Sequence, residues 1–390
     1  MNYFWGDNTR KRVTMKKNKI MILFGTRPEA IKMAPLVIAL KQDPRFETII
    51  TLTAQHREML DQVLELFAIA AEYDLNLMKP GQTLAYLTAS ILEELKPILE
   101  KEQPQMILVH GDTTTAFASA LSAFYQQIAI GHVEAGLRTK NKYSPYPEEM
   151  NRTLIGQLGD LHFAPTIGNQ ANLLKEDIPL EKIVITGNTV IDALLMTVKA
   201  DYHFDNPVLN TIDYQKRRVI LLTCHRRENL GQPMEQIFSA IRELVLANPD
   251  IEVVFPMHPN PAIAEKARPR LEDLDRVHLL APLDYREISN LMGRVYLVLT
   301  DSGGIQEEAP ALGKPVVVLR QETERPEAVA AGTVIMGGIE KNNILKVTQN
   351  LLDNPAAYQA MAHAVNPYGD GKASQRICEA LADYFTMKNQ

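Results

Sequence analysis

Three acidic segments in the first half of the chain follow short apolar runs that predict β-strands, and their central residues are Asp112, Glu134 and Glu148. Asp112 and Glu148 could instead serve the first turn of a helix, as a cap or as charges that favour the helix dipole. Glu134 could instead pair with Arg138. Carboxylates that gather in one cleft shift one another's pKa, however, so these three residues are candidate general acids and bases.

Basic residues and glycines at other strand ends predict a site for an anion. The segment 300–308 runs from a strand through Ser-Gly-Gly into a helix, so backbone N–H groups can approach a phosphate closely. Glu308, one turn into that helix, could accept the hydroxyls of a ribose, and His225 could contact a phosphate or a leaving group. The residues that could hold the anion and its attached groups are Arg27, Lys32, His225, Ser302, Gly303, Gly304, Glu308 and Arg325.

Several motifs that would indicate a cofactor are missing from the sequence. No GxGxxG follows a predicted strand, and the patterns GxxxxGK[ST], HExxH and GxSxG do not occur. The two cysteines, Cys224 and Cys378, stand outside any CxxC or Cys/His pattern. We therefore expect no bound redox cofactor, no metal site and no disulfide framework.

Composition excludes further classes of protein. The 390 residues are 46% hydrophobic and 23% charged, which is the balance of a globular protein with a substantial core. The net charge of −6 provides no overall field that would attract nucleic acid. The apolar runs are too short to span a bilayer, and residues 1–19 lack the apolar run of a signal peptide. A cytoplasmic enzyme without nucleic-acid or membrane partners is expected.

An alternation of apolar runs and helical segments must position these candidate residues. Unbroken apolar runs are typical of strands buried on both faces, and hence of parallel sheets covered by helices. Predicted strands cover residues 19–24, 48–53, 106–109, 128–131, 218–223, 252–255, 277–280, 295–299 and 315–319. Ligands of such sheets bind beyond the carboxyl ends of the strands, where the acidic and glycine-rich segments lie.

A polar stretch interrupts this alternation and predicts two Rossmann-like α/β domains with a cleft between them. The expected division is a disordered leader at 1–18, an N-terminal domain at 19–200, a linker at 201–217, a C-terminal domain at 218–372 and a final helix at 373–390. Met15 could be an alternative start of the chain.

Eight sequence motifs each give only modest evidence for a protein family, but together they are highly specific. They are GTRPEAIKMAP, TAQHREMLDQV, VHGDTTTAF, VEAGLRT, YPEEMNR, HFAPT, TCHRREN and TDSGGIQEEAPALGKPVVVLRQETERPEA. Together and in this order, from about Ile20 to the last helix, they resemble the non-hydrolysing UDP-N-acetylglucosamine 2-epimerases. The resemblance implies the glycosyltransferase-B architecture, in which two Rossmann-like domains face a deep cleft, the second binds UDP, and the last helix crosses back to the first.

The resemblance also implies an activity and the roles of particular residues. Members interconvert UDP-N-acetylglucosamine and UDP-N-acetylmannosamine without a cofactor, are usually homodimers, and fit the synthesis of envelope polysaccharide. Asp112, Glu134 and Glu148 would be the catalytic carboxylates, and His225 would lie beside the diphosphate and aid the departure of UDP. Ile288 replaces a phenylalanine that is common in relatives. The residues implied to bind the UDP portion are Arg27, Lys32, Leu283, Ile288, Ser302, Gly303, Gly304, Glu308 and Arg325.

The implied reaction is demanding because the C2–H bond of the sugar is not acidic. Without a redox cofactor, the remaining route is anti elimination of UDP to 2-acetamidoglucal, followed by re-addition of UDP and reprotonation of C2 on the other face. Which carboxylate takes the proton and which donates it stays open at this point. Gln55 and His56 lie in the motif tied to activation by a second substrate molecule.

Three alternative functions fit the same sequence features. A hydrolysing epimerase would release free N-acetylmannosamine and UDP, because water would capture the intermediate. A retaining glycosyltransferase would need an acceptor and would leave C2 untouched. A sensor of nucleotide sugars would bind its ligand without turnover, although acidic segments that face an anionic ligand would oppose mere binding.

Overall fold

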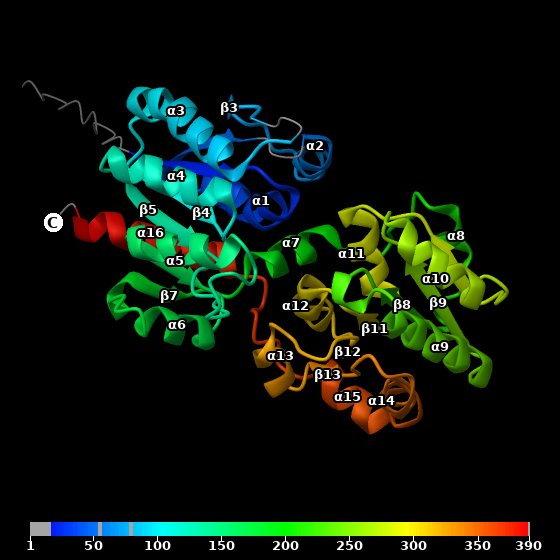
Figure 1. The fold of residues 1–390 in the computed structure, drawn as a ribbon. Coiled ribbons are helices and arrows are strands. Elements are labelled where there is room, and N and C mark those ends of the chain that lie inside the picture. The colour runs from blue at the N-terminus through cyan, green and yellow to red at the C-terminus, as the bar shows by residue number, and fades with distance from the viewer. Residues whose placement is uncertain (1–16, 54–56, 78–80, 389–390) are drawn as a thin grey trace, which may run out of the picture.

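The computed structural model describes residues 17–53, 57–77 and 81–388, and the strands of these residues form two sheets, one in each half of the molecule (Figure 1). The first sheet contains β1 (Asn18–Phe24), β2 (Phe46–Leu52), β3 (Tyr73–Asp74), β4 (Met106–His110), β5 (Ala129–Val133), β6 (Leu161–Ala164) and β7 (Ile183–Ile185). The second sheet contains β8 (Arg218–Thr223), β9 (Ile251–Pro256), β10 (Val277–Leu280), β11 (Leu297–Thr300), β12 (Val316–Val318) and β13 (Val334–Met336).

The two sheets share one topology. The strand order is β3-β2-β1-β4-β5-β6-β7 in the first and β10-β9-β8-β11-β12-β13 in the second, and every neighbouring pair is parallel. The order reverses between β1 and β4 and between β8 and β11, and open parallel sheets bind ligands at such points. The predicted α/β class is confirmed, and the two Rossmann-like sheets form the predicted glycosyltransferase-B arrangement.

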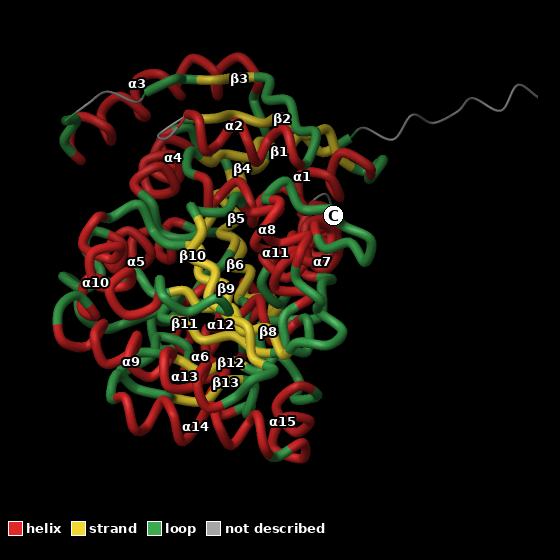
Figure 2. Tube along the Cα trace, turned by 90° about the vertical axis from the view of Figure 1, so that its right-hand side faces the viewer, coloured by secondary structure: helices red, strands yellow, loops and turns green. Residues whose placement is uncertain are grey.

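Helices connect successive strands and lie outside the sheets (Figure 2). They are α1 (Arg27–Gln42), α2 (Arg57–Leu66), α3 (Leu84–Glu102), α4 (Thr114–Tyr125), α5 (Glu148–Leu158), α6 (Ile167–Leu174), α7 (Thr189–Thr197), α8 (Pro207–Thr211), α9 (Gln232–Ala247), α10 (Pro261–Leu271), α11 (Tyr285–Arg294), α12 (Gly303–Ala311), α13 (Pro326–Ala330), α14 (Lys341–Asp353), α15 (Pro355–Ala362) and α16 (Ala373–Lys388), with short 3₁₀ turns at Leu180–Lys182 and Arg227–Asn229. Within the described ranges, no helix combines the length and the apolar character that a membrane span requires.

The apolar strands explain why helices cover both faces of the first sheet. Successive side chains of a strand point to opposite faces. Ile20 and Ile22 of β1 therefore join the core cluster beneath α1, whereas Met21 and Leu23 join the cluster beneath α3 and α4. The strands β3, β6, β7 and β13 were not among the predicted ones, because their apolar runs, unlike the run 315–319 around β12, are interrupted or end within three residues.

Helix α16 leaves the second half of the chain and packs on the first sheet, as expected for this architecture (Figure 1, red). Its residues Ile377, Leu381 and Phe385 are buried in the same core cluster as residues of α1. The polar stretch at 201–217 contains α8. Phe204, which precedes α8 in this stretch, is buried in a core cluster of the second half. Both crossings of the chain between the halves are therefore held by apolar packing.

Candidate active site

Glu134 lies directly beyond β5, at the carboxyl edge of the first sheet, in a left-handed backbone conformation with φ of 62°. Residues with side chains adopt this conformation rarely, and strained residues of this kind concentrate at functional sites. Its Oε1 atom lies 2.5 Å from Nζ of Lys32, and its Oε2 atom lies 3.2 Å from Nε2 of His110. Arg138 pairs with Glu176 at 2.7 Å, so the alternative pairing of Glu134 with Arg138 is wrong.

The surroundings of Glu134 keep its carboxylate ionised. Burial alone would raise its pKa, but the charge and the hydrogen bond of Lys32, together with His110 and Arg325, outweigh this effect, and the pKa of Glu134 lies well below its usual value. Burial lowers the pKa of His110 to about 4, so this histidine is uncharged at neutral pH. An ionised carboxylate that is held in place by one cation can accept a proton from a substrate.

Asp112 follows β4, the strand beside β5, and its carboxylate lies 2.5 Å from the guanidinium group of Arg152. Burial raises the pKa of Asp112; Arg152 opposes this effect, while the charges of Glu134 and Glu148 add to it. The pKa values of Asp112 and Glu134 are thus displaced in opposite directions, and such environments distinguish an acid from a base. The side chain of Thr113 caps α4, so the capping alternative for Asp112 is wrong.

The two glutamates at the start of α5 have different surroundings. Glu149 is buried and accepts the backbone N–H groups of Thr139 and Lys140, and so holds the preceding loop in place. Glu148 is half-buried, and its charge acts on Asp112. The structure therefore brings the three carboxylates predicted from the sequence within electrostatic reach of one another.

The carboxyl edge of the second sheet carries a helix N-terminus and arginines. Gly303 and Gly304 form the first turn of α12 directly after β11, and Ser302 occupies the N-cap position. A Cβ atom added to Gly303 would lie 3.7 Å from the guanidinium groups of both Arg226 and Arg325. Two guanidinium groups beside the positive end of a helix dipole favour an anion.

His225 follows β8, the strand beside β11, and its ring is held from two sides. Its Nδ1 atom lies 3.2 Å from Oδ1 of Asp301, a fully buried residue that also accepts the backbone N–H of His225. The ring stacks on the ring of His258, with centroids 5.6 Å apart. Because Nδ1 faces Asp301, Nε2 is the ring atom left for a ligand.

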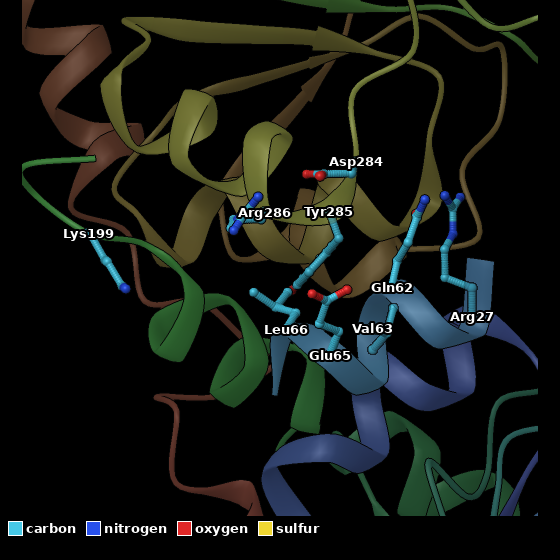
Figure 3. Close-up of a pocket in the computed structure, with 9 residues that line it drawn as sticks. All are labelled: Arg27, Gln62, Val63, Glu65, Leu66, Lys199, Asp284, Tyr285 and Arg286. Atoms are coloured by element: carbon cyan, nitrogen blue, oxygen red, sulfur yellow. The ribbon is translucent and has the colours of Figure 1, made fainter. Parts of the chain in front are cut away.

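A cavity of about 370 Å³ lies between α2 and α11, where the two halves face each other (Figure 3). Arg27 lines this cavity together with Asp284 and Tyr285, which follow Leu283, a residue that the resemblance assigns to the UDP portion. Leu283 and Ile288 pack partly against the core of the second half. The cavity is therefore lined both by a residue that follows β1 in the first half and by the residues that begin α11 in the second half.

Two residues predicted to bind the UDP portion hold carboxylates of the protein itself. Lys32 pairs with Glu134, and Nε of Arg325 pairs with Oε1 of Glu307. Nδ2 of Asn188 donates to Oε2 of Glu307 at 2.7 Å and to Oε1 of Glu134 at 2.8 Å. A network of side chains thus connects the edge of the first sheet to the edge of the second.

Unlike Asp112, Glu134 and Glu307, Glu308 has no ion pair with a cation among the described residues. It is 8% exposed, and burial, with the charge of Glu307, raises its pKa to about 7. A carboxyl group with this pKa both donates and accepts hydrogen bonds near neutral pH, which suits contact with hydroxyl groups.

Sequence reasoning missed His110, Asn188, Asp301 and Glu307 as parts of this network. Asn188 lies just beyond β7, so the end of this strand was the signal that could have identified it. Asp301 and His110 lie in motifs that were recognised in the sequence. The neighbouring residues of each gave no indication of its partner, which comes from another segment of the chain. Gln55 and His56 lie outside the described residues.

Comparisons with known proteins agree with this geometry. The family model described as UDP-N-acetylglucosamine 2-epimerase matches residues 38–382. The UDP-N-acetylglucosamine 2-epimerase of Bacillus subtilis is 53% identical over 376 residues, which cover 96% of this chain and 98% of that protein. A crystal structure from Listeria monocytogenes matches with a TM-score of 0.91 at 52% identity, covering 95% of this chain and 98% of that one.

A crystal structure of the UDP-GlcNAc 2-epimerase from Neisseria meningitidis, bound to UDP-GlcNAc, matches with a TM-score of 0.83 at 48% identity. The match covers 94% of this chain and all of that one. The similarity thus extends through both sheets and over the strand ends that hold the candidate residues. This chain belongs to the UDP-N-acetylglucosamine 2-epimerase family.

Proposed function

We propose that this protein interconverts UDP-N-acetylglucosamine and UDP-N-acetylmannosamine without releasing the free sugar. One observation carries the proposal: carboxylates with oppositely displaced pKa values stand at one sheet edge, and a helix N-terminus with two guanidinium groups stands at the other. The first set suits proton transfer, and the second suits a diphosphate. The related Neisseria meningitidis protein, which is bound to UDP-GlcNAc, supports this choice of substrate.

In the proposed first step, the C1–O bond to UDP breaks and its electron pair leaves on the β-phosphate oxygen. The proton at C2 passes to a carboxylate, which gives UDP and 2-acetamidoglucal. We assign this base role to Glu134, because Lys32 keeps its carboxylate ionised. In the second step, the same UDP oxygen re-forms the bond to C1 while Asp112, whose pKa is raised, delivers a proton to the opposite face of C2. Exchange with water then restores both carboxylates.

The second sheet would stabilise the departing UDP. The first turn of α12, Arg226, Arg325 and Nε2 of His225 can all lie against the negative charge that develops on the diphosphate. The loss of one such preorganised contact costs on the order of 3 kcal/mol in the barrier. Closure of the two halves around the glucal would exclude water, which otherwise leads to hydrolysis.

NMR of the protein with UDP-N-acetylglucosamine in deuterated buffer tests this function. We expect UDP-N-acetylmannosamine with deuterium at C2. Product that keeps protium at C2 would reject the elimination mechanism. Free N-acetylmannosamine together with UDP would indicate the hydrolysing reaction instead. Turnover that requires an added acceptor and leaves C2 unchanged would indicate a glycosyltransferase, and tight binding without turnover would indicate a sensor.

We further propose that the protein is a cytoplasmic homodimer whose product serves envelope polysaccharide synthesis. Phe124 and Tyr125 at the end of α4 are 55% and 64% exposed, and Met150 and Leu154 of the neighbouring α5 are also exposed. Large apolar side chains that are exposed on two neighbouring helices are typical of an interaction surface. Light scattering should give twice the mass of one chain, and Leu154→Glu should give the mass of a single chain.

A further inference from the structure

Asn188 stands where the chain crosses between the two halves. Its side chain is buried, and its Oδ1 atom caps α7 by accepting the N–H of Val190 at 3.0 Å. Its backbone N–H donates to the carbonyl oxygen of Tyr368 at 2.7 Å, in the segment that leads to α16. A Cβ atom on Gly187 would lie only 3.2 Å from the Cα atom of Gly369, so the two crossing segments are in close contact. The position of the Asn188 side chain is therefore determined by the backbone on both sides.

The side-chain nitrogen of Asn188 uses both of its N–H donors on carboxylates. One bond reaches Glu134 at 2.8 Å, at the edge of the first sheet, and the other reaches Glu307 at 2.7 Å, on α12 of the second half. With Oδ1 occupied by the helix cap, every hydrogen-bonding group of this side chain has a partner.

Asn188 lies between two carboxylates, each with a cation on its far side, so a neutral donor is needed at its position. Lys32 pairs with Glu134 at one end, and Arg325 pairs with Glu307 at the other. Two buried carboxylates on either side of one residue repel each other, and hydrogen-bond donors between them offset the cost of burying both charges. Among the residues that cap helices well, asparagine is the one that offers two side-chain N–H donors.

We propose that Asn188 is a positioning residue for the reaction: it orients the carboxylate of Glu134 and couples it to the Glu307–Arg325 pair at the anion-binding edge. A diphosphate that attracts Arg325 changes the charge beside Glu307, and the amide of Asn188 transmits this change to Glu134. This inference rests on the proposed function.

Two variants separate this role from helix capping. Asn188→Ser keeps a capping oxygen but replaces the two N–H donors by one hydroxyl, which can donate to at most one carboxylate. Asn188→Asp keeps the cap and the shape but places a third carboxylate between the other two. We expect kcat to fall about 100-fold in Asn188→Asp and about tenfold in Asn188→Ser, because a displaced catalytic group costs activity of this order. KM for UDP-N-acetylglucosamine should change less than about threefold.

Asn354 provides matched controls, because its exposed side chain caps α15 far from the network. Asn354→Asp and Asn354→Ser should leave kcat unchanged. If both Asn188 variants keep kcat within about twofold of wild type, Asn188 is a helix cap only and the inference is overturned. Thermal melting reports folding, and if Asn188→Asp does not fold, the kcat of Asn188→Ser decides. A wild-type protein without epimerase activity would instead reject the proposed function.

Discussion

The carboxyl edges of the two sheets have opposite chemistry although the sheets share one topology. The edge of the first sheet gathers Asp112, Glu134 and Glu148, whereas the edge of the second gathers the N-terminus of α12 with Arg226 and Arg325. The same doubly wound scaffold therefore occurs twice, and the residue types at the strand ends decide whether an edge handles protons or an anion. Function lies in the site rather than in the fold.

The two edges also resemble each other in one respect, the local balance of charge. Asp112 pairs with Arg152, Glu134 pairs with Lys32, and Glu307 pairs with Arg325. Because Glu134 and Glu307 each have their own cation, and burial favours the neutral form of Asp112 despite Arg152, an anionic substrate can approach the acidic edge without strong repulsion. Buried ion pairs of this kind thus make the two edges compatible within one cleft.

The largest expected effect that tests this comparison comes from Glu134→Gln. This variant should lower kcat about a thousandfold, because it removes a general base, and should change UDP affinity less than about threefold. Initial rates and calorimetry with UDP measure the two quantities, with the exposed Glu181→Gln as a control that should behave as wild type. A kcat within tenfold of wild type would contradict the role of the first edge in proton transfer.

Glu308→Gln probes the buried carboxyl group of the second edge that has no ion pair among the described residues. The pKa of Glu308 in the folded state, about 7, lies above the ordinary value of 4.5, so its contribution to stability is present below pH 4.5 and is lost as pH rises through 7. Gln stays neutral, so the melting temperature of the variant should rise relative to wild type between pH 5 and pH 8. The loss in wild type is up to about 3 kcal/mol. An equal difference at both pH values would show that Glu308 does not titrate between them, and would contradict a pKa of about 7.

Gly303→Ala should change binding without harming the fold. The nearest atoms to an added Cβ lie 3.7 Å away, which is ordinary contact, and alanine favours a helix by about 0.5–1 kcal/mol over glycine. We expect an unchanged or higher melting temperature and a Kd for UDP raised about tenfold, because the methyl group keeps a phosphate from the backbone. An unchanged Kd would place the diphosphate elsewhere on the second edge.

Glu379→Gln should have the smallest effect and serves as a control for both edges. Glu379 of α16 pairs with Arg45 at 2.9 Å, but both side chains are substantially exposed, and exposed ion pairs contribute little. Melting temperature, kcat and UDP affinity should all equal the wild-type values. A clear loss of kcat would indicate that α16 supports the first edge through charge as well as through its apolar core contacts.

Much of the fold could be predicted because long apolar runs have few alternatives to a buried strand. The runs at 19–24 and 218–223 correspond closely to β1 and β8, which are interior strands of the two sheets. The apolar run of β7 ends after three residues at Thr186 and Gly187, so no local pattern identified this strand, and Asn188 beyond it was missed. A short edge strand forms because a neighbouring strand provides its hydrogen-bond partners, and the sequence of the short strand itself does not contain this information.

By itself, the sequence determined the alternation of strands and helices and the chemical type of each strand end. Hydrophobic periodicity and glycine or carboxylate residues are local properties, and they are sufficient to predict two edges of different chemistry. Only the tertiary structure decided that Glu134 pairs with Lys32, 102 residues earlier, and shares the amide of Asn188 with Glu307. The pKa of a carboxylate depends on charges and donors within a few ångströms, and folding brings these groups together from distant parts of the chain.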